Sequence, residues 1–139
     1  MTVSSEERLL AFDFQNPAGT TFRIGGGPWA IYLNLAQSFG WEPRGTFLRD
    51  RTDWHGGYDS SDGQTMVKED VDALRHTLLD AERHPQFDFA VSDTIARVEA
   101  SVEQSGMRIP AGMRNQPQVI KTGLPRLCTF LEAGEFRIL

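Results

Sequence analysis

The sequence predicts an α+β fold, a single domain in which a small, mainly antiparallel sheet packs against three or four helices. Three observations favour this fold. Apolar residues alternate with polar ones near both ends of the chain, they recur at helical spacing through its middle, and glycine or proline separates these stretches. A chain of 139 residues, of which 40% are hydrophobic, has the size of one domain with one core. We therefore expect residues 1–139 to form a single domain.

The strands are expected near the two ends of the chain. Phe12 and Phe14 alternate with polar residues, the turn-forming run QNPAGTT follows, and Phe22 and Ile24 resume the alternation, which is typical of a β-hairpin. A short strand is expected after GWEPR, and the closing run EFRIL is expected to form the last one. The expected strands lie near residues 9–14, 20–25, 45–49 and 135–139.

The helices follow from apolar spacing and from residues that begin or end a helix. Pro28 suits a first helical turn, and Gly40 suits the left-handed residue after a last one. The strongest pattern begins at Val67 and is ended by Pro85. Ser92 is expected to cap the next helix. The expected helices span residues 28–40, 67–84, 93–105 and 125–133. Residues 107–125, which lack a sustained period and contain proline and glycine, are expected to form a long irregular loop.

Composition and charge argue against several classes of protein. The net charge of −5 supplies no drive toward a polyanion, so a nucleic-acid partner is not expected. No apolar run approaches the roughly 20 residues that span a bilayer, and the opening MTVSSEERLL lacks the basic start of a signal peptide. We therefore expect a cytoplasmic protein without a membrane partner. The single Cys128 excludes an internal disulfide, and its apolar helical neighbours predict an inert, buried thiol.

The most distinctive stretch is WHGGYDSSDGQTMVKED, residues 54–70. Aromatic, acidic and glycine residues crowd there ahead of a helix, a composition favoured at binding sites. Its candidate binding residues are Trp54, His55, Tyr58, Asp59 and Asp62. His55 beside carboxylates is also a candidate general acid or base, or a metal ligand.

Two motifs resemble sites that bind a cofactor or a metal ion, but the needs of the backbone explain them better. If Gly63 were the sixth position of a calcium loop, Tyr58 would stand at the first, where a carboxylate belongs, so turn chemistry is favoured. The run IGGGPWA matches the spacing of a dinucleotide-binding turn, but Pro28 removes an N–H donor and the preceding strand is expected in a hairpin. No cofactor and no metal are therefore expected.

The helix expected over residues 67–84 presents a run of carboxylates that includes Glu69, Asp72 and Asp80, together with Asp70 and Glu82. Such a run usually forms the solvated side of a helix, and it also suits docking of a basic protein, whose capture it would speed. We count Glu69, Asp72 and Asp80 among the candidate binding residues.

Three segments resemble a family of small bacterial proteins of unknown function. They are GWEPRGT, YDSSDGQTMVKEDVDAL and FLEAGEFRIL, and together they cover about a quarter of the chain. The chain departs from the family pattern at Ser61, Thr129 and Glu135, and residues 107–125 look like an insertion. The resemblance implies an organised turn built on Trp41, Tyr58, Gly63 and Gln64, and it implies no activity.

Two functional hypotheses follow from the sequence. The first is a non-catalytic protein-binding module of the immunity or regulatory type, which the acidic balance and the lack of assembled catalytic groups favour. The second is a small enzyme or ligand-binding domain with its site at residues 54–62, with His55 as acid or base and residues 107–125 as a lid. A nucleotide-binding site at Gly25–Ala30 is a weaker third.

Overall fold

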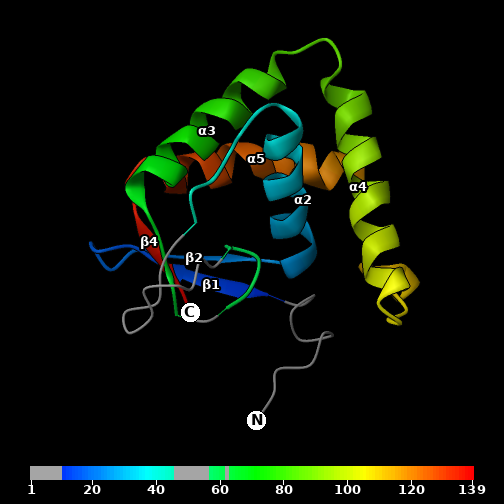
Figure 1. Ribbon diagram of the computed structural model, residues 1–139, viewed down its shortest axis with the longest axis horizontal. Coiled ribbons are helices and arrows are strands. Elements are labelled where there is room, and N and C mark those ends of the chain that lie inside the picture. Colours follow the sequence, from blue (N-terminus) through cyan, green and yellow to red (C-terminus); the bar gives the residue numbers. More distant parts are fainter. Residues whose placement is uncertain (1–10, 46–56, 62) are drawn as a thin grey trace.

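A computed structural model describes residues 11–45, 57–61 and 63–139, and it confirms the α+β fold. Four helices and a four-stranded antiparallel sheet enclose one hydrophobic core (Figure 1). In chain order the elements are β1 (Phe12–Gln15), β2 (Thr21–Ile24), α2 (Gly26–Ser38), β3 (Thr65–Met66), α3 (Lys68–Glu82), α4 (Phe87–Gln104), a short 3₁₀ helix η1 (Ala111–Met113), α5 (Pro117–Leu131) and β4 (Phe136–Ile138).

The strands are ordered β2-β1-β4-β3, and each neighbouring pair is antiparallel. Phe12 pairs with Ile24 and Phe14 with Phe22, so the predicted hairpin is confirmed. The alternation along each strand buries one face and exposes the other, because successive side chains point to opposite sides of a sheet. Phe14 is fully buried on the inner face. The exposed residues of the outer face are Asp13, Gln15, Thr21, Arg23 and Arg137.

The helices lie on the inner side of the sheet (Figure 1). Helix α2 stands between α3 and α4, and α5 crosses behind them. The centre of the core is aromatic. The ring of Phe14 lies 4.8 Å from that of Trp29 and 4.6 Å from that of Phe136, centroid to centroid. Aromatic pairs at such distances contribute beyond the area they bury, so they tie the first and last strands to the first described helix.

The structure contains a strand that the sequence did not predict. It is β3, which has two residues and pairs with β4 in the described sheet. The strand predicted near residues 45–49 falls outside the described residues except for Gly45, which lies outside any strand and has a φ of 81°. A two-residue strand is too short to show an alternating pattern, so sequence reasoning had no signal for it.

The prediction for α4 placed its start six residues too late. The helix begins at Phe87, and Ser92, the predicted cap, lies exposed inside it. Phe87, Val91 and Ile95 recur every four residues and all are buried. Packing of this apolar stripe onto the core, rather than a capping side chain, determines where the helix begins.

The long irregular loop was also predicted wrongly. Residues 111–113 form η1, and α5 begins at Pro117, so nearly two thirds of the expected loop is helical. Proline at the first helical position costs no hydrogen bond, because that N–H has no partner within the helix. Pro125 lies inside the helix, and the Thr129 hydroxyl donates to its carbonyl at 2.9 Å. Ile120 and Leu124 continue the buried stripe of the helix predicted from residue 125 onward.

Candidate functional site

The described part of the candidate binding stretch is an ordered turn packed against the last strand. Gln64 is buried, and its side-chain amide donates to the carbonyls of Gly57 at 3.3 Å and Ser60 at 2.6 Å. Gly63 has a φ of 76°, as its predicted turn role requires, and its N–H donates to the carbonyl of Ile138 at 2.8 Å. The turn is therefore fastened both to itself and to β4.

The candidate residues of this stretch separate in the structure. Tyr58 is buried and Asp59 is exposed, so these neighbours face different environments. Trp54, His55 and Asp62 lie outside the described residues, and the roles predicted for them stay predictions. Asp59 is therefore the one described residue of this set whose side chain is available to a ligand or partner.

Tyr58 belongs to a buried network centred on Asp70, in the first turn of α3. The Tyr58 hydroxyl donates to Asp70 Oδ2 at 2.6 Å. The backbone N–H groups of Arg44 and Gly45 donate to the same carboxylate at 3.0 Å each. Asp70 is only 3% exposed. Its carboxylate thus joins α3 to two segments distant in sequence, and its inclusion in the outward acidic face was wrong.

Two indole N–H groups complete this network. Trp41 Nε1 donates to the carbonyl of Asp70 at 3.2 Å, and Trp29 Nε1 donates to the carbonyl of Tyr58 at 2.6 Å. Burial, together with the hydrogen bond to Asp70, raises the pKa of the Tyr58 hydroxyl above its ordinary value. The phenol is therefore neutral near pH 7 and serves as a donor to Asp70, which is a structural role.

Two clefts meet beside this network. One, of about 420 Å³, lies between α2 and α4 over Phe12. The other, of about 310 Å³, is bordered by Trp41 and Tyr58. Asn34 and Asp59 line both clefts, so they stand at the junction. The sizes fall at the lower end of the range typical of small-molecule sites.

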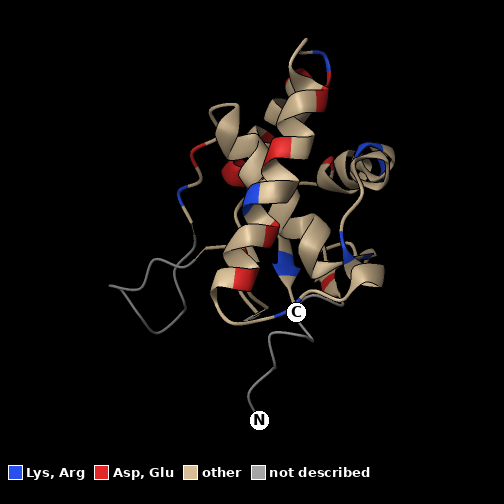
Figure 2. Ribbon diagram, turned by 90° about the vertical axis from the view of Figure 1, so that its right-hand side faces the viewer, with Lys and Arg blue, Asp and Glu red and all other residues tan. Residues whose placement is uncertain are grey.

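The acidic candidates on α3 lie on its exposed side. Glu69, Asp72 and Asp80 are all exposed, and we call this set the α3 acidic face. Two of the three carboxylates are paired along the helix, Asp72 with Lys68 and Asp80 with His76. Helix α5, in contrast, carries Lys121 and Arg126 and no acidic residue, so charge is unevenly distributed over the molecule (Figure 2).

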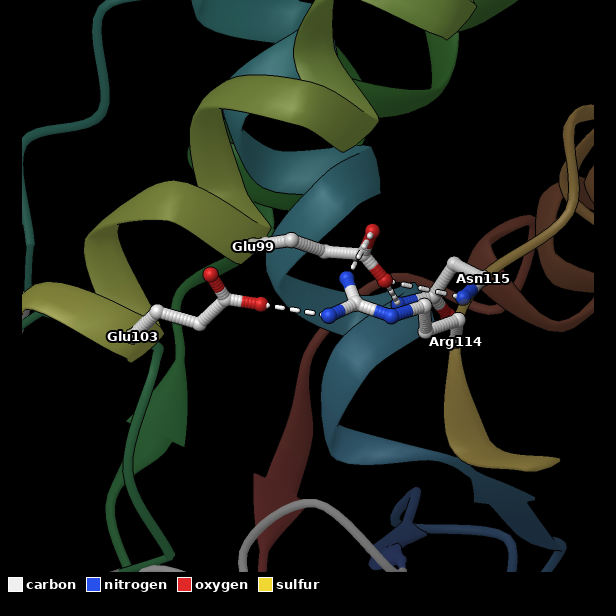
Figure 3. A network of polar contacts seen from close by, with 4 residues as sticks. All are labelled: Glu99, Glu103, Arg114 and Asn115. Atoms are coloured by element: carbon white, nitrogen blue, oxygen red, sulfur yellow. Dashed lines mark hydrogen bonds and ion pairs between the residues drawn. The ribbon is translucent and has the colours of Figure 1, made fainter. Parts of the chain in front are cut away.

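A polar network that the sequence did not predict joins α4 to the segment before α5, as Figure 3 shows. Arg114 lies between Glu103, at 2.7 Å, and Glu99, at 3.6 Å. The backbone N–H of Asn115 also donates to Glu99, at 2.9 Å. These contacts hold the segment before α5 against α4. The spacing of Glu99 and Glu103, four residues apart on one helix, was the available signal.

The glycine run ahead of α2 has a packing role. The strand before it pairs antiparallel with β1, as expected of a hairpin and unlike a dinucleotide-binding unit. A Cβ on Gly27 would lie 2.9 Å from the side-chain nitrogen of Asn115. A larger residue at this position would therefore displace the Asn115 side chain from the place it holds. The glycine run, whose spacing resembles a dinucleotide-binding turn, thus packs closely against another segment of the chain.

The remaining groups with shifted pKa values are buried structural residues. Burial raises the pKa of the Cys128 thiol to about 11, so the prediction of a buried, protonated thiol is confirmed. Burial also raises the pKa of Tyr32, whose hydroxyl donates to the carbonyl of Ile120 at 2.6 Å. Among the residues that the structure describes, no group of three histidine, cysteine or acidic side chains is placed to hold a metal ion.

No protein-family model matches the chain, and neither the curated proteins nor the solved structures contain a significant match. The resemblance to small bacterial proteins therefore stays a prediction, although the turn residues it implies are in place, with Trp41, Tyr58 and Gln64 buried. Within the described ranges, every helix is too short or too polar to cross a membrane.

Proposed function

We propose that the protein is a non-catalytic protein-binding module that binds a basic partner through the α3 acidic face. The observation that carries this proposal is the arrangement of α3. Its inner side, which includes Val71 and Leu74, is fully buried, whereas Glu69, Asp72 and Asp80 are exposed on its outer side. At 1.5 Å per residue these carboxylates extend over about 16 Å, a length suited to several contacts with one partner.

The ion pairs along α3 are compatible with such a partner. The side chains of Lys68 and His76 are 69% and 80% exposed, so both can leave Asp72 and Asp80 at small cost, because exposed pairs contribute little to stability. A partner's arginine can bind a carboxylate with two hydrogen bonds, which neither Lys68 nor His76 offers. Exchange of the internal partner for an external one is therefore favourable when the external cation is an arginine.

The chemistry of the central network supports a binding role over catalysis. Tyr58 and Asp70 form the described acid–hydroxyl pair that would be a first candidate for proton transfer. Both are buried, and the Asp70 carboxylate already accepts hydrogen bonds from Tyr58 and from two backbone N–H groups. Their interactions are satisfied within the fold, so this pair supports the position of α3 and of the turn at residues 57–61.

The test is capture of a partner followed by charge reversal. Tagged protein is incubated at low salt with an extract of the source organism, and a stoichiometric partner is identified by mass spectrometry and purified. Its Kd is then measured by calorimetry for the wild type and for the triple variant Glu69→Lys, Asp72→Lys and Asp80→Lys. We expect Kd to rise at least tenfold for this variant and to rise steeply with salt.

A matched variant controls for net charge. Asp88→Lys, Asp93→Lys and Glu135→Lys change the net charge by the same amount at exposed positions away from the α3 acidic face. Circular dichroism establishes that both variants fold. Equal weakening by the two variants, or no weakening by the α3 variant, contradicts the proposed surface. Weakening by the α3 variant alone supports it.

A second candidate function, small-ligand binding, is favoured by the junction of the two clefts. Asp59 is exposed there and has no ion pair in the described structure, and Asn34 lies beside it in both clefts. A panel of small metabolites, screened by the shift in thermal unfolding, tests this function. A shift lost in Asp59→Asn but kept in Asp72→Asn supports the clefts, and a panel without shifts contradicts them.

A further inference from the structure

Strand β2 is an edge of the sheet, and its outer backbone groups have no partner in the described structure. The N–H of Asn16 donates to the carbonyl of Thr20, which makes these two residues a hydrogen-bonded pair. Such pairs alternate along an antiparallel ladder. Phe22 and Ile24 therefore direct their backbone groups toward β1, and Thr21 and Arg23 direct theirs outward. An open strand edge of this kind is able to pair with another extended chain.

A groove runs beside this edge, between β2 and α5. It has a volume of about 160 Å³, and its lining includes Phe22, Pro28, Val119 and Arg126. Val119 is 61% exposed and is one of the few large apolar side chains in the described structure with that much exposure. Phe22 is half-buried in the same lining. The groove thus offers an apolar surface of the size of one side chain next to unpaired backbone.

The charge beside the groove is positive. Arg126 is exposed on α5, and no ion pair is formed by it in the described structure. The described lining contains no acidic residue. Arg23 also lines the groove, and its Nε lies 3.9 Å from an Asp13 carboxylate oxygen. A ligand that carries a carboxylate is therefore favoured at the α5 side of the groove.

We propose that β2 and α5 form a docking groove for an extended acidic and apolar peptide segment of a partner protein. The segment adds a strand to the sheet through the backbone groups of Thr21 and Arg23. An apolar side chain of the peptide packs on Phe22 and Val119, and a carboxylate two residues away approaches Arg126. Strand addition combined with a side-chain pocket is a recurring mode of peptide recognition. This surface is separate from the α3 acidic face, so the proposal goes beyond the proposed function.

Charge distinguishes this occupant from a second copy of the chain. Two β2 strands paired about a twofold axis would bring Arg23 and Arg126 of both copies to one interface. Like charges placed together at an interface oppose association. A peptide that carries an acidic residue two positions from an apolar one meets the same edge with complementary charge, because residues two apart lie on one face of a strand.

The test uses selection from a randomised seven-residue peptide library displayed on phage, with the wild-type protein as bait. We expect enrichment of sequences in which an acidic residue stands two positions from an apolar one, so that both side chains lie on the face of the added strand that meets the groove. The affinity of the best synthetic peptide, measured by fluorescence anisotropy, is expected to fall at least tenfold in Arg126→Glu and in Val119→Asp. Arg108→Glu, an exposed arginine outside the groove lining, serves as the charge-matched control and should leave affinity unchanged.

The backbone contribution has its own variant and its own peptide. Thr21→Pro removes an N–H that points outward and changes no side chain of the groove lining, and proline is tolerated at such edge positions, so the variant should fold and lose the peptide. The same peptide with N-methyl groups at alternate residues should also lose affinity. Selection that enriches nothing, or peptides that bind all groove variants as well as the wild type, overturns the proposal. Concentration-dependent dimerisation that Thr21→Pro abolishes assigns the edge to a second copy and likewise overturns it.

Discussion

Asp70 and Glu99 perform the same task in two differently solvated regions. Each is a carboxylate on a helix that accepts backbone N–H groups from a segment without regular secondary structure, Asp70 from Arg44 and Gly45 and Glu99 from Asn115. Asp70 is 3% exposed and its partners are neutral donors. The side chain of Glu99 is 13% exposed and lies beside the cation Arg114.

This difference shows why a neighbouring cation is a poor guide to how much a carboxylate contributes to the stability of the fold. Asp70 sits in the first turn of α3, where the helix dipole favours an anion, and three donors replace the water that burial removes. Arg114 attracts Glu99 from a position that is 44% exposed, where water competes for both charges. Asp70, for which the described structure shows no counterion, should therefore contribute more to stability than Glu99, which has one.

The largest effect is expected for Asp70→Ala. The substitution leaves the Tyr58 hydroxyl and the N–H groups of Arg44 and Gly45 without an acceptor inside the protein. Loss of a buried network of this size costs on the order of 3–5 kcal/mol in the free energy of unfolding. Urea denaturation measures the change. A loss below about 1 kcal/mol would equate Asp70 with a surface carboxylate and remove the contrast between the regions.

Tyr58→Phe should have the next largest effect, about 1–3 kcal/mol, because it removes one donor from Asp70 and keeps the ring in the core. Denaturation at neutral pH checks this value. Asp70→Ala combined with Tyr58→Phe should cost less than the sum of the two single changes, since the two residues share one hydrogen bond. Additive costs would show that the two side chains act independently.

The same variant gives a test by pH. Burial, with the hydrogen bond to Asp70, raises the pKa of Tyr58 above its ordinary value of 10.0. A folded pKa above the unfolded one adds stability that is present in full below pH 10 and is lost as the pH rises through the folded pKa. Above about pH 10, where the tyrosine of the unfolded chain ionises, the wild type should therefore lose stability faster than Tyr58→Phe. Parallel curves would contradict the raised pKa.

Glu99→Gln should cost about 0.5–1 kcal/mol. The amide oxygen can still accept from Asn115, and only the charge opposite Arg114 is lost. Thermal unfolding followed by circular dichroism measures the shift. A cost as large as that of Asp70→Ala would mean that the Arg114 network behaves as a buried one.

The smallest effect is expected for Arg114→Gln, a shift in Tm of no more than about 2 °C. The wild-type shift between low and high salt should be equally small, because the guanidinium is solvated. Hydrogen exchange at Asn115 offers a local readout. If its amide exchanges no faster in the variant, Arg114 does not help to hold the segment before α5.

The sequence predicted the parts of the fold that depend on regular apolar spacing. The hairpin, α3 and the last strand were predicted from alternation or from a period of 3.6, and the structure confirms them. The start of α4 was missed because Ser92 was interpreted as its cap, and half of α5 was missed because proline and glycine were interpreted as marks of a loop. Gly123 in α5 is instead a close contact, since a Cβ there would lie 2.7 Å from the Tyr32 hydroxyl.

The candidate site was harder to predict, because its central residue looked like a surface acid. Asp70 precedes Leu74 by four residues and Leu78 by eight, which places it on the buried stripe of α3. That spacing was present in the sequence, but a carboxylate on such a stripe is uncommon, and its donors come from residues 25 and more positions earlier and from Tyr58. Long-range pairing of this kind leaves no periodic signal.

The position of β4 has a consequence for synthesis of the chain on the ribosome. Strand β4 lies between β1 and β3, although it leaves the ribosome after both of them. The hairpin of β1 and β2 and the first helices can form early, but the sheet has an unfilled centre until residues 136–138 emerge. During that interval the nascent chain exposes two unpaired strand edges. Chaperones bind incompletely folded chains that expose such surfaces. The sheet can therefore be completed only after β4, one of its shortest strands, has been synthesised.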